Sequence, residues 1–395
     1  MANKIDIPDG WEVKKLGEVV NINNSSLKEN TDPNYAFTYI DLSSVNQGKI
    51  DIPIEQIYFK EAPSRARRLI EINNIIISTV RPNLQGFAYI DFTCKDYIVS
   101  TGFAVLSYKC NINMKFLYNM FYSNILMKQI NAIITGSNYP AISSADIKNF
   151  IIPVPPLAEQ EKIAEILSLW DKAIEQTKEL IAYKEKQKKG LMQNLLTGKK
   201  RLHGFNDKWK TYIVKELGLV ITGKTPSTEK NEYYGDEFLF ITPTDIHYKY
   251  TTKTERNLSK SGLNKSKLIP KNSVLITCIA SIGKNTINKS DCAINQQINA
   301  IVPNNNFYYE YIYYYMTFNS PYLLKFAGKS ATSIINKTTF EEIDVTIPPL
   351  DEQKAIADIL CKADEEIELL NKQLDLYTEQ KKGLMQNLLT GKVRV

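Results

Sequence analysis

Two stretches of the chain carry apolar side chains in alternating steps of four and three residues. In the second stretch they fall at positions 356, 360, 363, 367, 370, 374, 377, 384 and 388, with Lys381 as an interruption. In the first stretch they fall at positions 163, 167, 170, 174, 181, 191 and 195. This heptad spacing predicts two long coiled-coil helices. Pro155-Pro156 and Pro348-Pro349 are expected at the helix starts, and Gly198 and Gly391 at their ends.

The rest of the chain shows a different pattern, in which short β-branched and aromatic runs are separated by turn residues. Such runs occur at 37–42, 74–80, 238–242 and 274–280 and predict strands. One helix is expected near 114–134 and another near 307–327. Strands and helices that do not alternate regularly predict an α+β fold for these blocks rather than a βαβ fold.

The chain is an internal duplication with a period of about half its length. The segment QKKGLMQNLLTGK occurs at 187–199 and again at 380–392, and PPLAEQEKIAEIL (155–167) aligns with PPLDEQKAIADIL (348–360). The repeat predicts four segments: a variable block at 1–155, a helical spacer at 156–200, a second variable block at 201–348 and a second spacer at 349–395.

Connectivity restricts how the two helices can pair. The second variable block begins where the first helix ends and leads into the start of the second helix. An antiparallel pair needs no long return of the chain, whereas a parallel pair requires one that exceeds the size of such a domain. We therefore expect an antiparallel coiled coil about 60 Å long. A globular domain is then expected at each end, and a pseudo-twofold axis relates the halves.

Composition and charge add a moderate indication of a polyanionic partner. The chain has 395 residues and a net charge of +6, and its 43% hydrophobic content is that of a globular protein. The segment 201–348 carries most of the excess, with 18 Lys and Arg against 13 Asp and Glu. Five cysteines without paired spacing and a charged N-terminus without an apolar core favour an intracellular, soluble protein.

Catalytic motifs are nearly absent. Residues 218–225 match the G-x-x-x-x-G-K-T pattern of a phosphate-binding loop, but the intervening LVIT predicts a strand, and no convincing helix follows. The two histidines, His203 and His247, leave little room for a metal cluster or a Ser-His-Asp arrangement. No glycine-rich loop with an Asn-Pro-Pro-aromatic tetrapeptide is present for adenine methylation. We expect a chain without a catalytic, metal or cofactor site of its own.

Clusters of Arg, Lys, Asn and Gln are candidates for DNA contacts because these side chains bind base edges and phosphates. An alternative for each is ion pairing on a solvated surface, or a plain turn where a loop is concerned. In the first block the candidates are Arg65, Arg67, Arg68, Arg81, Asn83, Gln85, Ser137, Asn138 and Tyr139. In the second block they are Lys249, Lys253, Arg256, Lys284, Asn285, Gln296, Gln297, Lys329 and Ser330.

Two divergent blocks each open with Trp and Leu-Gly, and each is followed by PPLxEQxxI, a long helix and KKGLMQNLLTGK. This layout resembles the specificity subunit of type I restriction–modification systems. The resemblance covers essentially the whole chain. It implies two target recognition domains that each read one half of a split, asymmetric DNA site. It also implies that the helices set the spacing of the half-sites.

The resemblance further implies partner subunits. Two modification subunits with S-adenosylmethionine are expected to methylate adenine, and restriction subunits with ATP and Mg to cleave DNA, all in the cytoplasm. Two identical helix ends suit two copies of one partner, although recombination between the repeats also explains their identity. The partner-docking candidates are Glu159, Gln160, Lys188, Lys189, Glu352, Gln353, Lys381 and Lys382.

Gly190 and Gly383, inside the helices, suggest close packing on the other helix or on a partner. The alternative function is a coiled-coil scaffold or adaptor with two protein-binding domains and no role on DNA.

Overall fold

The computed structural model describes residues 7–134, 140–328 and 333–395. The chain forms two compact units, one made of residues 1–178 and 372–395 and the other of residues 179–371. Each unit holds one variable block together with part of both long helices. The units are described one at a time.

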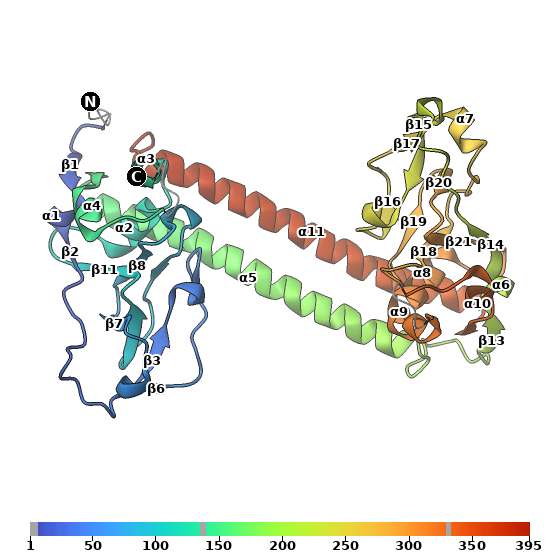
Figure 1. Cartoon of the computed structure of the whole chain (residues 1–395), viewed down its shortest axis with the longest axis horizontal. Coiled ribbons are helices and arrows are strands. Elements are labelled where there is room, and N and C mark those ends of the chain that lie inside the picture. The colour runs from blue at the N-terminus through green and yellow to red at the C-terminus, as the bar shows by residue number, and fades with distance from the viewer. Residues whose placement is uncertain (1–6, 135–139, 329–332) are drawn as a thin grey trace. The chain divides into compact units, whose positions relative to one another are not determined.

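The first unit is built on small sheets (Figure 1). The central sheet has the order β2-β11-β8-β9, a second sheet has the order β6-β3-β10-β7, and the pairs β1-β12 and β4-β5 are antiparallel. The strands are β1 (Glu12–Lys15), β2 (Val20–Ile22), β3 (Ala36–Ile40), β4 (Val45–Asn46), β5 (Lys49–Ile50), β6 (Ile57–Tyr58), β7 (Ala66–Leu69), β8 (Ile75–Ser78), β9 (Phe87–Tyr89), β10 (Tyr97–Ser100), β11 (Phe103–Tyr108) and β12 (Ile151–Val154).

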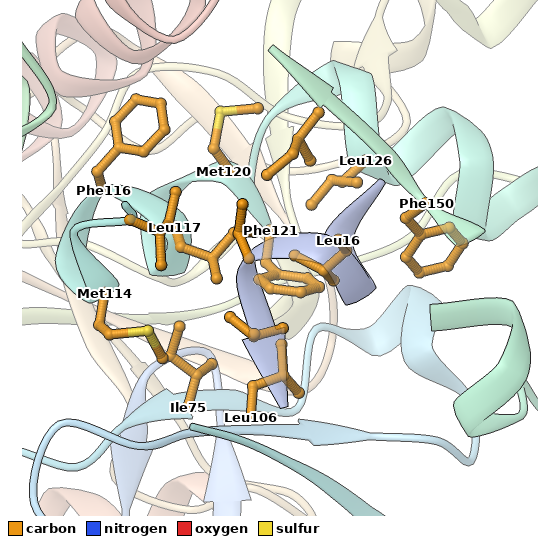
Figure 2. Packing of buried hydrophobic residues seen from close by; sticks show 14 of the residues in the cluster. Leu16, Ile75, Leu106, Met114, Phe116, Leu117, Met120, Phe121, Leu126 and Phe150 are labelled. Carbon is orange, nitrogen blue, oxygen red and sulfur yellow. The ribbon is translucent and has the colours of Figure 1, made fainter. Parts of the chain in front are cut away.

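Helices cover one face of this central sheet. They are α1 (Leu16–Val19), α2 (Met114–Met120), α3 (Asn124–Ile134) and α4 (Ser144–Asn149). Figure 2 shows apolar side chains of α2 lying over Leu16, Ile75 and Leu106, all buried. The prediction of a single helix near 114–134 is wrong in one respect, because the segment forms two helices, α2 and α3. The buried Ser123 breaks it, because its hydroxyl donates to Met120 O at 2.6 Å and accepts from Leu126 N at 3.4 Å.

The second unit repeats the plan with a five-stranded sheet, β14-β21-β18-β19-β16, a three-stranded sheet, β17-β15-β20, and the pair β13-β22. The strands are β13 (Lys210–Ile213), β14 (Gly218–Thr222), β15 (Tyr234–Ile241), β16 (Tyr250–Thr251), β17 (Asn257–Leu258), β18 (Val274–Thr277), β19 (Asn285–Asn288), β20 (Cys292–Ile294), β21 (Ile298–Pro303) and β22 (Asp344–Ile347). The helices are α6 (Val214–Leu217), α7 (Lys260–Leu263), α8 (Tyr309–Phe318), α9 (Ser320–Leu323) and α10 (Lys337–Glu341).

The helix expected near 307–327 is also divided. It ends at Asn319, where ψ is 8°, and Pro321 in the first turn of α9 restarts it. The two strand-rich blocks are therefore mixed α+β, as predicted. Equivalent features recur in both, including a parallel strand pair (β3-β10 and β15-β20) and an isolated bridge (Val80 to Ala141 and Ile279 to Ile334).

The two predicted long helices are α5 (Leu157–Leu195) and α11 (Leu350–Leu388). Each begins one residue after its proline pair, so Pro156 precedes the first turn and its carbonyl accepts from Gln160 N at 3.1 Å. Gly198 and Gly391 follow the helices with φ of +67° and +71°, the left-handed conformation that glycine adopts readily. None of the described helices is long and apolar enough to span a membrane.

Within each unit the two helices pair antiparallel. In the first unit Trp170 packs edge-on against Tyr377 with ring centroids 5.6 Å apart, while Ile163 shares a core with Leu388. In the second unit Lys184 contacts Glu366 at 2.7 Å, while Leu195 shares a core with Ile356. In both units the residue number falls on one helix as it rises on the other, which confirms the predicted orientation.

Burial along α11 follows the predicted heptad. Seam positions such as Ile367, Leu374 and Tyr377 are half-buried, whereas Leu369 and Leu376 outside the seam are exposed. The polar Lys381 occupies a seam position and ion-pairs with Asp171 at 2.5 Å. A polar seam residue is therefore tolerated because the facing helix neutralises it.

The two glycines inside the long helices do not pack closely against the rest of the chain. A Cβ atom added at Gly190 or at Gly383 would meet no other atom within 4 Å. The interpretation of close helix-on-helix packing is therefore wrong.

Candidate nucleic-acid interface

In the first unit, backbone hydrogen bonds gather three separate segments at one end of the central sheet. Arg81 N donates to Pro140 O at 2.7 Å, which joins the β8-β9 turn to the chain before α4. Thr79 N donates to Gly102 O at 2.9 Å, and Thr101 N donates to Arg65 O at 2.7 Å. Arg65 and Arg81, which lie 16 positions apart in the sequence, therefore lie at the same end of the central sheet. We call this end of the sheet the edge of the first unit.

The side chains at this edge differ in their exposure to solvent. Arg65, Arg81 and Asn83 are exposed, and Gln85 is half-buried. Arg81 and Gln85 adopt left-handed backbone conformations, with φ of +47° and +58°. Such angles are uncommon outside glycine and indicate a turn whose shape is imposed by its surroundings.

Arg67 and Arg68 face other parts of the same domain. The Arg67 guanidinium stacks over the Phe59 ring, 4.8 Å from its centroid, and donates to Ala66 O at 2.8 Å. Arg68 is half-buried and donates to Ser26 Oγ at 3.2 Å. These contacts hold both side chains in the domain, whereas Arg65 and Arg81 stay available. Ser137, Asn138 and Tyr139 lie outside the described residues.

The second unit has an equivalent edge made of different side chains. Cys278 N donates to Gln297 O at 2.8 Å, as Thr79 N does to Gly102 O in the first unit. Ala280 N donates to Ser333 O at 3.0 Å, which matches the Arg81 to Pro140 bond. Two candidates, Gln296 and Gln297, lie in the β20-β21 turn of this edge.

Lys284 and Asn285 enter β19 from the neighbouring β18-β19 turn. The Lys284 side chain is exposed, and its carbonyl accepts from Thr277 N at 2.9 Å. Asn285 Oδ1 accepts from Thr317 at 3.1 Å, while its buried Nδ2 has no partner in the described structure. Because this nitrogen is buried, Asn285 does not present it to a ligand in this structure.

The prediction of Lys249 as a DNA contact is wrong in this structure. Its side chain is 12% exposed, and Nζ lies 3.1 Å from Tyr314 Oη, 2.9 Å from Cys361 Sγ and 3.8 Å from Glu310 Oε1. Burial disfavours charge on Glu310, but hydrogen bonds from Cys361 and Tyr250 and the Lys249 charge hold its pKa below its usual range. Lys249 therefore neutralises an internal carboxylate.

Lys253 and Arg256 are exposed and lie on the link from β16 to β17. Arg256 lines a hollow with Asn231 and Tyr234. Lys329 and Ser330 lie outside the described residues. Of the second-block candidates, the edge therefore brings together Lys284, Asn285, Gln296 and Gln297.

Four of the partner-docking candidates are internal instead. Glu352, 1% exposed, accepts from Arg201 Nε at 2.6 Å, from Arg201 Nη2 at 2.7 Å and from Trp209 Nε1 at 3.1 Å. In the first unit Glu159 accepts in the same way from Arg394 and Trp11. We call these two groups the Trp-Glu-Arg clasps.

The neighbouring glutamines are equally enclosed. Gln160 Oε1 accepts from Asn113 N at 2.7 Å, and Gln353 Oε1 accepts from Tyr308 N at 2.8 Å. The EQ pair in each helix thus fixes the first turn to the variable block that precedes it, which corrects its interpretation as a partner surface.

The four lysine candidates differ from one another. Lys188 and Lys381 are half-buried and ion-pair with Asp364 and Asp171 on the facing helix. Lys189 and Lys382 are exposed. Only the latter two remain open candidates for partner contact.

Sequence reasoning missed Lys224. The expectation that LVIT (219–222) forms a strand rather than a phosphate-binding loop is confirmed, because β14 (Gly218–Thr222) pairs with β21 along its whole length. Because the motif does not predict a nucleotide site, Lys224 is not among the DNA-contact candidates from the sequence. The structure places its backbone at the second edge, where Lys224 N donates to Ile294 O at 3.0 Å.

Two strand-rich blocks with matching edges, each clasped to a pair of antiparallel helices, define a duplicated recognition protein. The family model for the type I restriction modification DNA specificity domain matches residues 8–183 and again 206–376. The chain therefore belongs to the type I restriction–modification DNA specificity family.

Relatives and solved structures extend along the whole chain. The HindI type I restriction enzyme specificity subunit of Haemophilus influenzae is 26% identical over 97% of this chain and 99% of its own length. A chain from a solved structure of a type I R-M system superposes with a TM-score of 0.63 at 23% identity, over 98% of this chain and 100% of that one. The HsdS subunit of Thermoanaerobacter tengcongensis has a TM-score of 0.55 at 23% identity, over 99% of both chains. These structures share the fold.

Proposed function

We propose that this chain is the DNA-reading subunit of a type I restriction–modification complex and that each recognition block reads one half of a bipartite, asymmetric site. The observation that carries the proposal is the pair of equivalent edges with unlike side chains. One presents the exposed Arg65, Arg81 and Asn83, and the other presents the exposed Lys284 and Gln296. Different donors and acceptors on one scaffold should select different bases.

We further propose that the complex contains two modification subunits and, for cleavage, restriction subunits. The solved structure of a type I R-M system that shares the fold is described in terms of complex assembly, which fits a subunit that works with partners. In this proposal the partner subunits bind S-adenosylmethionine, ATP and Mg. The chain itself performs no catalysis, and the complex works in the cytoplasm.

The proposal is tested by mapping adenine methylation in cells that express the modification subunits with or without this chain. We expect methylation at one split sequence only when the chain is present. Methylation at the same sites without it would contradict the proposal. A scaffold without a role on DNA predicts no sequence-dependent signal, and no salt-dependent binding of duplex DNA by the assembled complex.

A further inference from the structure

The segment Gly223-Lys224-Thr225 follows β14 and is held rigidly at the second edge. Gly223 N donates to Ile298 O at 3.1 Å, and Lys224 N donates to Ile294 O at 3.0 Å. A Cβ atom at Gly223 would lie 2.1 Å from Asn295 O, so only glycine permits this close approach. The segment therefore packs directly against the β20-β21 turn that contains Gln296.

Thr225 fixes the orientation of the Gln296 side chain. Its hydroxyl donates to Gln296 Oε1 at 2.5 Å, which leaves the amide nitrogen with its two N–H donors out of this contact. Gln296 is exposed. An amide that is oriented before binding loses less conformational freedom when it contacts a ligand.

The turn beneath Gln296 is also fixed by its own side chains. Asn295 Nδ2 donates to Gln297 Oε1 at 3.0 Å, and Gln297 N donates to Asn295 Oδ1 at 3.1 Å. Gln297, half-buried in these contacts, supports the turn, so Gln296 is the side chain that the turn presents outward.

Three exposed lysines lie on segments next to the Thr225-Gln296 pair. Lys224 is exposed, and Ser266 Oγ donates to Lys224 O at 2.6 Å, which places the exposed Lys265 and Lys267 on either side of that contact in the sequence. Within the described part of the chain, no ion pair involves these three lysines. Unpaired lysines beside an oriented amide suit a ligand that combines phosphates with hydrogen-bonding base edges.

We propose that Gln296, oriented by Thr225, reads a base of the half-site recognised by the second block, and that Lys224 contacts the adjacent backbone phosphate. This inference rests on the proposed function and assigns specific residues to it. Glutamine pairs with adenine through N6 and N7 in the major groove. Thr225 acts as a positioning residue, because it works through Gln296.

The experiment uses the full chain assembled with its modification subunits and compares methylated sequences for wild type, Gln296→Ala, Thr225→Val and the double variant. We expect Gln296→Ala to relax one base position of the second half-site, with discrimination falling about tenfold or more. Thr225→Val should relax the same position less strongly. The double variant should match Gln296→Ala, because Thr225 then has nothing to orient. An unchanged recognised sequence in Gln296→Ala would overturn the proposal, as would relaxation at another position in Thr225→Val.

Lys224→Ala tests the phosphate contact separately. We expect weaker binding of every duplex and a salt dependence reduced by about one unit in slope, with the recognised sequence unchanged. Lys271→Ala is the matched control, because Lys271 is an exposed lysine of the same block that precedes the first residue of β18. Lys224 instead follows Gly223, which bonds to Ile298 opposite Thr277, the last residue of β18. Equal effects of the two substitutions would overturn this assignment.

Two further readouts separate the possible failures. Unchanged thermal unfolding of each variant shows that the fold is retained, and a variant that unfolds early is replaced by Gln296→Glu, which keeps the size of the side chain and should disfavour the same base. If wild type directs no site-specific methylation, the proposed function fails. If wild type directs it and Gln296→Glu does not alter it, only the assignment of Gln296 fails.

Discussion

At the scale of single residues, the Trp-Glu-Arg clasps explain why buried carboxylates sit in the first turn of each long helix. Glu352 is almost fully buried, yet it is satisfied by two nitrogens of Arg201 and by Trp209. A buried charge is tolerated only with such partners. The clasp also joins the chain that follows α5 to the start of α11, so it connects segments about 150 residues apart.

The first prediction removes the guanidinium from this clasp. Arg201→Ala leaves the Glu352 carboxylate with only the indole donor, and should lower the free energy of unfolding of the second unit by about 3 kcal/mol. Denaturant unfolding followed by Trp209 fluorescence, in a background with Trp11→Phe and Trp170→Phe, measures this loss. Arg201→Lys should recover part of it.

The control is Lys215→Ala, which breaks an exposed ion pair with Glu342 in the same unit. Exposed pairs contribute little, so the transition should not move measurably. A comparable loss in Arg201→Ala and Lys215→Ala would contradict a special role for the clasp.

Residue roles were the least predictable part of the molecule. The EQ pair recurs in both helices, and repetition on a predicted surface helix suggested docking. The partners that bury it, Trp11 with Arg394 and Trp209 with Arg201, are remote in sequence. The role of Lys249 is unpredictable for the same reason, because its partners Glu310 and Cys361 come from other elements. A single sequence carries no signal for such contacts.

At the scale of elements, the long helices were predictable because heptad periodicity is a local signal that pairing reinforces. The division of the helices expected at 114–134 and 307–327 was not predictable, since a single buried Ser123 or the Asn319-Ser320-Pro321 step interrupts an otherwise apolar helical pattern. Strands appeared where β-branched runs predicted them, but their grouping into separate small sheets depends on pairing between distant segments.

A second prediction concerns the helix seam in the first unit. Tyr377→Ala removes a half-buried ring that packs against Trp170, and should destabilise this unit by about 2 kcal/mol. The neighbouring Leu376 is 62% exposed, so Leu376→Ala should cost less than about 0.5 kcal/mol. Unfolding monitored by Trp170 fluorescence compares the two. Equal losses would mean that the seam lies elsewhere on α11.

A third prediction uses the glycines inside the helices. Because Cβ atoms at both sites would meet open space, Gly190→Ala and Gly383→Ala should each stabilise the free chain by about 1 kcal/mol. Thermal or denaturant unfolding measures the gain, and destabilisation would contradict the open geometry.

Assembly of the glycine variants with the modification subunits answers a separate question. Loss of assembly in Gly190→Ala and Gly383→Ala would show that a partner packs against the glycines. Retained assembly would favour recombination between the repeats as the reason for the identical helix ends.

At the scale of the whole molecule, the repeat constrains function more than any single residue does. The two clasps, the two edges and the two paired helix segments are built from equivalent positions, whereas the side chains of the edges differ. The side chains that support the fold are thus equivalent in the two halves, whereas the exposed side chains at the two edges differ. Such a division is what a protein needs if it reads two unlike half-sites with one architecture.

The final prediction exchanges residues 201–348 for the corresponding block of another family member. If each block reads its own half-site, methylation mapping should show one half-site replaced, with the other half-site and the spacing retained. Arg201 lies at the first position of this segment and clasps Glu352, so the exchange must keep that arginine. The matched control exchanges the same segment but carries Arg201→Ala, which should yield an unstable subunit rather than a new specificity. A change in both half-sites would mean that the blocks do not read DNA independently, and the boundaries at 201 and 348 would then need to be redrawn.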